Sequence, residues 1–532
     1  MHRGGSCVSY QQFAIAASAA LALAALSCGA AEAQKKTIRS VPIGSLKIVD
    51  PIWTTAYITR NHAYMVWDTL FALDANNVPQ PQMVDTWTVS DDKLTYTFKL
   101  RDGLKWHDNS PVRAADCVAS VKRWAAKDGM GRALWEFVAG IEAVDEASFK
   151  LVLKQPVGFV LEALGKIDSN VPFMMPERLA NTDPNTQITE VIGSGPFRFV
   201  KEEFVPGSKV VYEKFEGYVP RKEPASQAAG GKVVKIDRVE STYLPDAAVA
   251  TAALAKGELD LLESPSDDLM RTVEKNPNVV IEPNDPLGYQ LFLVINHLHP
   301  PFDKKEARQA LMWGIKQTDY LAAIITDPKR YQACPAVFGC GGASESRLGA
   351  EALAGFDPAK AKAILTGSGY DGRPLVVMDP ADNTILHPAA LVTAQMLRRM
   401  GATVDLQAMD WSTLTQRRAS KDPPGQVGWN LFVTNATLTG IGNPLLHTYV
   451  KNCEQAWYGW PCDKKIVDLT RQWAVETDSA KRKEITDALQ QAHMDHVSYI
   501  PLGQYRSIIA YRKELTGLIR APSLFYWNIE KR

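Results

Sequence analysis

The chain has no excess of charge of either sign. Its 532 residues include 59 lysines and arginines and 59 aspartates and glutamates, so the formal net charge at pH 7 is zero. Proteins that bind nucleic acid or an anionic membrane surface through their overall charge have a basic excess or a basic patch. The balance gives no electrostatic reason for either interaction, and we expect no nucleic acid among its partners.

Long apolar runs are also missing, except near the N-terminus. Phe13–Leu26 is rich in alanine and leucine, but it is shorter than the roughly 18 residues that span a bilayer. It is followed by Ala31-Glu32-Ala33, the small-x-small pattern of a signal peptidase site. We therefore predict that residues 1–33 are a cleaved signal peptide and that a soluble mature chain begins at Gln34 in the periplasm.

Cys28 offers a lipid-anchored alternative. A lipoprotein signal has a large aliphatic residue three positions before the cysteine, with a small residue next. Here Ala25-Leu26-Ser27 has these residues in a different order. The sequence therefore favours a soluble product over anchoring at Cys28.

Cysteine is scarce, with seven in the whole chain. Cys334 and Cys340, and likewise Cys453 and Cys462, enclose short turn-rich loops, which is typical of local disulfides in an oxidising compartment. Zinc binding is the alternative, but neither pair has the two-to-four-residue spacing of a metal site. Cys117 lies on a predicted apolar helix face, and we expect it to be a buried free thiol.

The usual catalytic motifs are absent from the sequence. It contains neither HExxH nor GxSxG. The pairs His493/His496 and His297/His299 lack the third ligand and the glutamate base of a zinc hydrolase. We expect a binding protein rather than an enzyme, with no catalytic residue, cofactor or metal.

One segment combines several clear local patterns. Hydrophobic and polar residues alternate over Leu94–Leu100, as in a half-buried strand. Asp102-Gly103 predicts a turn into a second short strand, Leu104–His107. A helix is expected next, with Asp116 in its first turn, where a carboxylate favours the helix dipole.

The sequence of this segment, DDKLTYTFKLRDGLKWHDNSPVRAADCV, resembles the signature block of the bacterial extracellular solute-binding proteins of family 5. These are the peptide- and nickel-type receptors of ABC importers. Val191–Phe199 is similar to the family's GTGPY hairpin, and Asn296–Leu321 to its PPFDD…RQAL block. Phe356–Leu365 is similar to YDPEKAKALL. In the last two segments we expect Asp303 and Asp357 to cap helices.

The resemblance implies an α/β fold of the periplasmic-binding-protein type (type II, cluster C). Such a protein has two α/β lobes joined by a hinge, plus an inserted third lobe. We expect lobe I to combine residues 34–71, 191–285 and 501–532, lobe II to be the insertion 72–190, and lobe III to be 286–500. A cleft between lobes I and III would close over the solute, and the closed monomer would dock on an inner-membrane ABC permease.

The resemblance also indicates where a ligand is contacted. In relatives, the segment after the first strand's DP turn and a strand and loop of lobe III, here Trp429–His447, contribute to the cleft. Two tryptophans and an arginine elsewhere are additional candidates, although tryptophan on an amphipathic segment is also typical of a core. The predicted ligand-binding residues are Thr55, Tyr57, Arg132, Trp135, Trp411, Trp429, Thr434, Asn435, Thr437 and Asn443.

The segment Trp429–His447 contains no acidic residue. Peptide-binding relatives have an aspartate there that pairs with the free α-amino group. Alignment puts Gly440 at its position, or an adjacent residue if the register is shifted by one, and neither register supplies an acid. A charge-assisted hydrogen bond contributes roughly 1.5–3 kcal/mol. We therefore expect peptides with free amino termini to bind weakly, unless their charge is buried against another lobe. The alternative is that main-chain groups of the protein hydrogen-bond the peptide backbone, as in strand addition, so that no aspartate is needed.

The predicted function is capture of a peptide or peptide-like solute for an ABC importer. The alternative is a receptor for a non-peptide solute, such as a nickel chelate, an opine or an oligosaccharide, on the same fold. A periplasmic chaperone-like binder of peptides is a more distant alternative.

Overall fold

A computed structural model describes residues 1–2, 35–342, 344–425, 427–476 and 478–532. The predicted signal peptide beyond His2, and with it Cys28, lies outside the described residues. Among the described helices, none is long and apolar enough to cross a membrane. Residues 37–532 contain all the elements below.

The first sheet joins strands that are far apart in the sequence. Its central strand β1 is parallel to its neighbours β10 and β11, whereas β9 and β19 are antiparallel to theirs. Every strand of this sheet lies within the segments predicted for lobe I. The order is β12 (Val279–Pro283), β19 (Ile508–Arg512), β11 (Leu261–Leu262), β1 (Thr37–Val41), β10 (Arg238–Thr242), β9 (Lys209–Lys214) and β8 (Phe197–Phe199).

The second sheet is formed mainly by the segment predicted for lobe III. The order is β14 (Tyr331–Gln332), β18 (Tyr499–Tyr505), β13 (Tyr289–Ile295), β17 (Leu431–Thr437), β15 (Leu375–Pro380) and β16 (Val404–Met409). β15 is parallel to β16 and β17, and β13 is antiparallel to β17 and β18. β18 continues past residue 500, where the predicted boundary lies, because it pairs along its length with β13.

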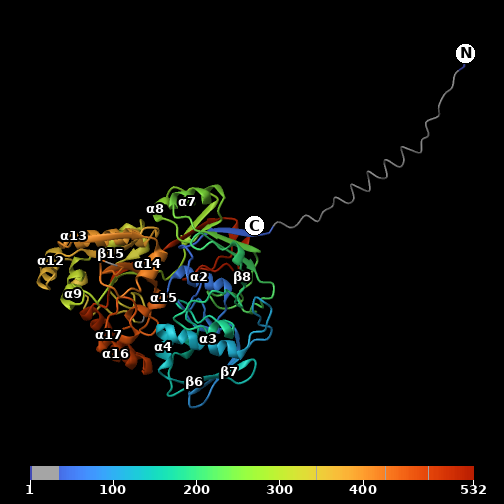
Figure 1. The fold of residues 1–532 in the computed structure, drawn as a ribbon, viewed down its shortest axis with the longest axis horizontal. Coiled ribbons are helices and arrows are strands. Elements are labelled where there is room, and N and C mark those ends of the chain that lie inside the picture. Colours follow the sequence, from blue (N-terminus) through green and yellow to red (C-terminus); the bar gives the residue numbers. More distant parts are fainter. Residues whose placement is uncertain (3–34, 343, 426, 477) are drawn as a thin grey trace. The chain divides into compact units, whose positions relative to one another are not determined.

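The third sheet lies in the predicted insertion and is antiparallel throughout. Its order is β4 (Val84–Val89), β5 (Thr95–Leu100), β7 (Ser148–Leu153) and β6 (Val138–Ala143). The accompanying helices are α3 (Ala114–Lys127), α4 (Gly129–Trp135), α5 (Val160–Leu164) and α6 (Glu177–Ala180). Figure 1 shows α3, α4, β6 and β7 together in cyan.

The remaining helices pack mainly around the first two sheets. Beside the first sheet are α2 (Tyr57–Val66), α7 (Ala247–Lys256) and α8 (Asp267–Met270). With the second sheet are α9 (Lys305–Gly314), α10 (Gln317–Ile324), α11 (Glu351–Ala354), α12 (Pro358–Gly367), α13 (Leu386–Arg399), α14 (Trp411–Arg417), α15 (Leu438–Ile441), α16 (Lys464–Val475) and α17 (Ser479–His496). Two-stranded pairs are β2 (Phe71–Leu73) with β3 (Pro79–Pro81) and β20 (Leu515–Thr516) with β21 (Glu530–Lys531).

Two large apolar cores and a smaller one beside the first sheet hold this arrangement together. Of the two large cores, one combines residues of the first sheet with those of the insertion, and the other lies around the second sheet. Tyr57, at the start of α2, belongs to the second core although its helix packs beside the first sheet. The ring of Tyr57 therefore reaches across the boundary between the two sheets.

The local predictions around the signature segment are partly confirmed. β5 forms as expected, and Asp116 in the first turn of α3 accepts a hydrogen bond from the backbone N–H of Arg113 at 2.8 Å. The predicted second strand at Leu104–His107 is wrong. Only an isolated antiparallel bridge between Lys105 and Pro111 forms there, in a tight loop in which the N–H of Trp106 donates to the carbonyl of Ser110 at 2.9 Å.

The two capping predictions have opposite outcomes. Asp357 caps α12, accepting from the N–H of Lys360 at 2.9 Å, with Pro358 in the first turn. Asp303 is not a cap, because α9 begins one residue later than expected and Lys304 occupies its N-cap position without a side-chain bond.

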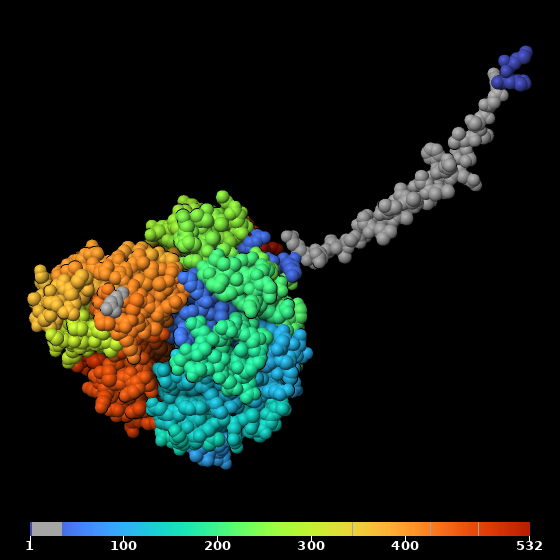
Figure 2. Space-filling view, in the orientation of Figure 1, coloured from blue at the N-terminus to red at the C-terminus, as the bar shows by residue number. Residues whose placement is uncertain are grey.

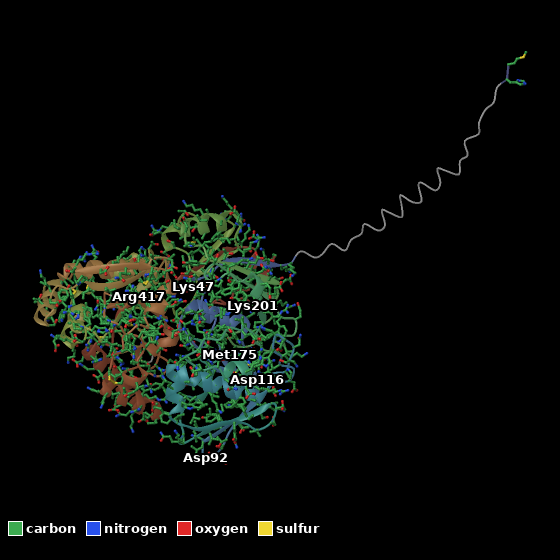
Figure 3. All side chains as sticks on the ribbon, in the orientation of Figure 1. Lys47, Asp92, Asp116, Met175, Lys201 and Arg417 are labelled. Atoms are coloured by element: carbon green, nitrogen blue, oxygen red, sulfur yellow. A yellow bond between two sulfur atoms is a disulfide. The ribbon has the colours of Figure 1, made fainter. Side chains whose placement is uncertain are left out.

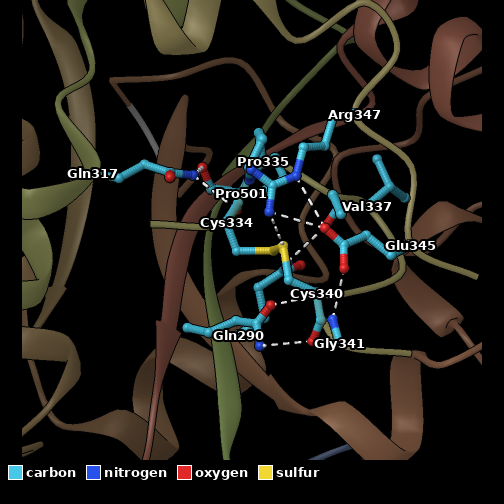
Figure 4. The surroundings of a disulfide bond; sticks show 12 residues. Gln290, Gln317, Cys334, Pro335, Val337, Cys340, Gly341, Glu345, Arg347 and Pro501 are labelled. Carbon is cyan, nitrogen blue, oxygen red and sulfur yellow. Dashed lines mark hydrogen bonds and ion pairs between the residues drawn. A yellow bond between two sulfur atoms is a disulfide. The ribbon is translucent and has the colours of Figure 1, made fainter. Parts of the chain in front are cut away.

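Both predicted disulfides are present, and Cys117 is a buried free thiol. Figure 4 shows the Cys334–Cys340 bond, whose loop is held by neighbours on both sides. The side-chain amide of Gln317 donates to the carbonyl of Cys334 at 2.9 Å. Burial raises the pKa of the Cys117 thiol, so it stays protonated.

Two connections join the first sheet to the second. One leads from β12 to β13 and the other from β18 to β19. They lie side by side, since the N–H of Asn284 in the first donates to the carbonyl of Ser507 in the second at 3.1 Å. This pair of short connections has the form of a two-stranded hinge.

Candidate ligand-binding cleft

A cavity lies between the first and second sheets, beside the hinge. It encloses about 720 Å³ of empty space, part of which is open to solvent. Ile43 and Glu263 reach it from just beyond β1 and β11, and Asn383 from just beyond β15. These are carboxyl ends of parallel strands, the usual position of ligand sites in open α/β sheets.

Five of the predicted site residues line this cavity. They come from both sides of the cleft and are Thr55, Tyr57, Trp411, Thr434 and Asn435. Their contribution to ligand binding stays a prediction.

Hydrogen bonds cross the cleft between these two sides. The hydroxyl of Tyr57 accepts from the N–H of Thr437 at 2.9 Å. Lys47, labelled in Figure 3, forms an ion pair with Asp410 at 2.9 Å. Tyr243 donates to the Asp382 carboxylate at 2.9 Å.

In Figure 2 the orange surface that includes the second sheet correspondingly meets the blue N-terminal surface. The structure thus has the cleft in a closed arrangement.

Arg418, directly after α14, is a buried cation in the cavity wall. It is 2 % exposed, and its Nη2 donates to Thr55 Oγ1 at 2.9 Å across the cleft. Its guanidinium carbon lies 4.8 Å from the ring centre of Tyr458 and 5.0 Å from that of Trp457. Among the described residues no carboxylate pairs with it, and its Nε has no hydrogen-bond partner. Burial lowers the pKa of Arg418.

Glu263 is a buried carboxyl group in the opposite wall. Its Oε2 accepts from the N–H of Ile43 at 2.8 Å, and its Oε1 accepts from the side-chain amide of Asn61. Burial raises the pKa of Glu263 to about 7, although Arg60 nearby acts in the opposite direction. Within the described part of the chain, no cation forms an ion pair with Glu263.

A second buried acid, Asp168, lies beneath the cavity wall. Its Oδ1 accepts from the hydroxyls of Tyr57 and Thr437, both at 2.9 Å, and lies 3.6 Å from Nη1 of Arg60. Its carboxyl group occupies the space next to Gly440. Asp168 thus contributes its charge to the protein's own bonds.

The other five predicted residues lie away from this cavity. Trp429 is fully buried, and its indole donates to the carbonyl of Arg418. Thr437 bonds Asp168, as described above. Asn443 accepts from the backbone N–H groups of Leu445 and Leu446, so its side chain shapes the loop.

Arg132 and Trp135 belong to α4, in the insertion. Arg132 donates to the carbonyl of Gln455 at 3.3 Å, and Trp135 packs partly buried against the core that includes the insertion. Arg132 therefore lies at a contact between the insertion and the segment that joins β17 to β18.

Several cavity residues were missed by sequence reasoning. The charged ones are Glu263 and Arg418, and the neutral ones include Asn284, Tyr289, Tyr449 and Tyr505. For Glu263 a signal existed, because a charged residue directly after the apolar pair Leu261-Leu262 at a strand end is an expected ligand position. For Arg418 no local signal distinguished it from Arg417.

Comparison with known proteins agrees with this architecture. The family model of bacterial extracellular solute-binding proteins, family 5 (middle region), matches residues 78–441. The probable peptide ABC transporter periplasmic-binding protein y4tO of Sinorhizobium fredii is 38% identical, over 97% of this chain and 98% of its own length. The glutathione-binding protein GsiB of Escherichia coli K12 is 26% identical, over 94% of both chains.

A solved structure shows the same fold. The dipeptide-binding protein from Pseudoalteromonas sp. SM9913, in complex with Met-Leu, superposes with a TM-score of 0.78 at 17% identity, covering 93% of this chain and all of its own. Together with the sequence matches, this shows that the chain belongs to the bacterial extracellular solute-binding proteins of family 5.

Proposed function

We propose that the protein is the periplasmic receptor of an ABC importer and that it carries a peptide or peptide-like solute to the permease. The solute occupies the cavity between the two sheets, and the protein acts by binding rather than by catalysis. The relative that is 38% identical over nearly the whole chain is named as a probable peptide ABC transporter protein, which supports this solute class.

The observation that carries the proposal is the unpaired guanidinium of Arg418. A buried cation without a carboxylate partner is costly, unless an anionic ligand group completes its hydrogen bonds. A planar guanidinium matches a carboxylate in shape and forms strong paired hydrogen bonds with it. The terminal carboxylate of a peptide is therefore the kind of group that would complete the hydrogen bonds of Arg418 in the cavity wall.

The sheets also support the proposed division into lobes. Lobe I comprises the first sheet, lobe II the insertion with the third sheet, and lobe III the second sheet. In this proposal the hinge beside Asn284 and Ser507 lets the solute shift an open–closed equilibrium, and the closed monomer is what the permease binds.

Native mass spectrometry of the protein, purified from the periplasm without denaturation, tests the solute class. We expect a bound species with the mass and fragmentation of a peptide that has a free carboxylate. A sugar or a metal chelate as the retained species would contradict the proposal.

A variant pair tests the role of Arg418. Arg418→Gln should weaken calorimetric binding of the retained peptide by about tenfold or more, because a charge-assisted hydrogen bond is lost. Arg417→Gln is the matched control, since Arg417 is only partly buried, does not line the cavity and donates to the carbonyls of Val427 and Gly428. Amidation of the peptide's carboxylate should weaken binding to the wild type but hardly to Arg418→Gln.

A further inference from the structure

The two charged side chains in the cavity wall lie on opposite sides of the cleft. Arg418 belongs to the segment of the second sheet, and Glu263 directly follows β11 of the first sheet. Among the described residues that line the cavity, they are the only cation and the only carboxyl group.

Glu263 has unused capacity to bind a ligand. A carboxylate offers about four acceptor positions, and Glu263 uses one on each oxygen, for Ile43 and Asn61. The nearest cation, Arg60, already has other hydrogen-bond partners. It donates to Asn61 Oδ1 at 3.0 Å and to the carbonyl of Pro522 at 2.6 Å, and it faces Asp168.

The loop of the second sheet has no room for an acid of its own. A Cβ atom at Gly440 would lie 2.3 Å from Cγ and 2.4 Å from Oδ2 of Asp168, far inside contact distance. Asp168 is itself bonded to Tyr57 and Thr437, and it does not line the cavity. A positive group of the solute thus finds a free carboxyl group only on the side of the first sheet.

We propose that Glu263 binds the positively charged group of the solute, in place of the acid that the loop of the second sheet lacks. The solute is then a zwitterion that spans the cleft, with its ammonium group against Glu263 and its carboxylate against Arg418. This inference rests on the proposed function and specifies its substrate class. Because the two charges of the solute meet opposite walls, closure of the cleft is needed to satisfy both.

The binding of an ammonium group by Glu263 should depend on pH, because only the ionised carboxylate attracts a positive charge. Burial raises its pKa to about 7, so below neutral pH the empty site holds a carboxylic acid that pairs poorly with an ammonium group. The tyrosines around it, Tyr212, Tyr289 and Tyr526, remain neutral because burial raises their pKa values. Asp285 in the hinge has a pKa raised to about 6 by burial, so it titrates in a similar range.

The test uses the mature full-length protein and two probe pools. One pool contains random di- to pentapeptides with free amino termini, and the other contains the same peptides N-acetylated. Retention by the protein after ultrafiltration is measured by mass spectrometry. The variants are wild type, Glu263→Gln and the control Glu258→Gln, which changes an exposed glutamate five positions earlier in the chain.

We expect wild type and Glu258→Gln to prefer the free-amine pool by about tenfold or more, and Glu263→Gln to lose that preference. Lowering the pH from about 7.5 to about 5.5 should reduce the preference of the wild type. The same pH change should leave Glu263→Gln unaffected, which separates Glu263 from Asp285. The pH response of the wild type remains a test if the variant does not fold.

Three results would overturn the inference, in distinguishable ways. An undiminished free-amine preference in Glu263→Gln would show that another group binds the ammonium. A wild type that prefers acetylated peptides would exclude a zwitterionic solute while leaving the peptide class intact. Retention of neither pool would refute the proposed function itself, and this inference with it.

Discussion

A side chain at Gly440 and the carboxyl group of Asp168 compete for the same space, with only 2.3 Å between a Cβ at residue 440 and Asp168 Cγ. Gly440 belongs to α15 and Asp168 to the insertion, so the two come from distant parts of the chain. Asp168 bonds Tyr57 near the first sheet and Thr437 in the second. One carboxyl group therefore links three segments that are expected to be separate lobes.

Gly440→Ala should lower the free energy of unfolding by about 1–3 kcal/mol, because Asp168 must move and its bonds to Tyr57 and Thr437 must stretch. Helix propensity alone predicts the opposite sign. Urea denaturation measures the change. Gly442→Ala is the control, since its added Cβ meets nothing closer than 3.5 Å. Equal stability of the two variants would contradict the steric argument.

Tyr57→Phe should favour the open cleft in the absence of solute. The hydroxyl that bridges the N–H of Thr437 and the carboxylate of Asp168 is lost, and each such bond contributes about 1 kcal/mol. Small-angle X-ray scattering should show a larger radius of gyration than in the wild type. Tyr370→Phe is the control, because the Tyr370 hydroxyl bonds the carbonyl of Arg373 far from the cleft. An unchanged radius in Tyr57→Phe would argue against this bridge as a closing contact.

Glu263→Gln should stabilise the solute-free protein at pH 8 and have little effect at pH 4. The folded-state pKa of Glu263 is about 7, above the value of 4.5 for an unperturbed glutamate. Below about pH 4.5 Glu263 is protonated in both the folded and the unfolded protein, so burial of the neutral group costs no proton uptake. As the pH rises through 7 the group must ionise in its buried position, and the folded state loses stability relative to the unfolded state. The stabilisation by Glu263→Gln should therefore be larger at pH 8 than at pH 4 by on the order of 3 kcal/mol. Thermal melting at both pH values measures it, and a stabilisation independent of pH would contradict the raised pKa.

Peptide mapping without reductant should recover the Cys334–Cys340 and Cys453–Cys462 disulfides from the exported protein. Cys117 is buried with a raised pKa, so a thiol reagent should modify it only after denaturation. Recovery of any of the four paired cysteines as a free thiol would contradict this arrangement.

N-terminal mass spectrometry of the exported protein should find a chain that starts at Gln34. The prediction comes from Ala31-Glu32-Ala33, and these residues lie outside those that the structure describes. An acylated Cys28 at the N-terminus would instead show a lipid-anchored protein.

The signature segment shows how far local patterns determine structure. Alternation of polar and apolar residues predicts β5, the helix dipole accounts for Asp116 at the start of α3, and capping accounts for Asp357 at the start of α12. All three patterns involve residues that are close in the sequence. Leu104–His107 forms only a single bridge, between Lys105 and Pro111, because β5 pairs with β4 and β7 instead of with this segment. The Asp102-Gly103 turn pattern does not reveal that choice of partner. Local rules therefore predict which segments form elements, although a strand such as β5 also needs its partners β4 and β7.

The cavity was harder to predict because its residues meet only through the tertiary fold. Thr55 was found through the resemblance and Trp411 as an additional tryptophan candidate, whereas Arg418 and its neighbour Arg417 are alike in sequence. Arg418 is fully buried by packing against Trp457 and Tyr458, whereas Arg417 is only partly buried. The lack of an acid in this loop was evident from the sequence, but the position of Asp168 in the space beside Gly440 was not.

The hinge residues Asn284 and Ser507 both lie in the cavity wall. Points close to a rotation axis move least, so contacts that a solute makes with these two residues remain nearly the same when the cleft opens. Such contacts add affinity to both states equally and cannot drive closure, because only differential affinity shifts an equilibrium. Contacts far from the axis, such as those of Trp411 and Thr55, must then decide which solutes close the protein. A compound that contacted only the hinge would occupy the site without closing the cleft, and would therefore inhibit uptake.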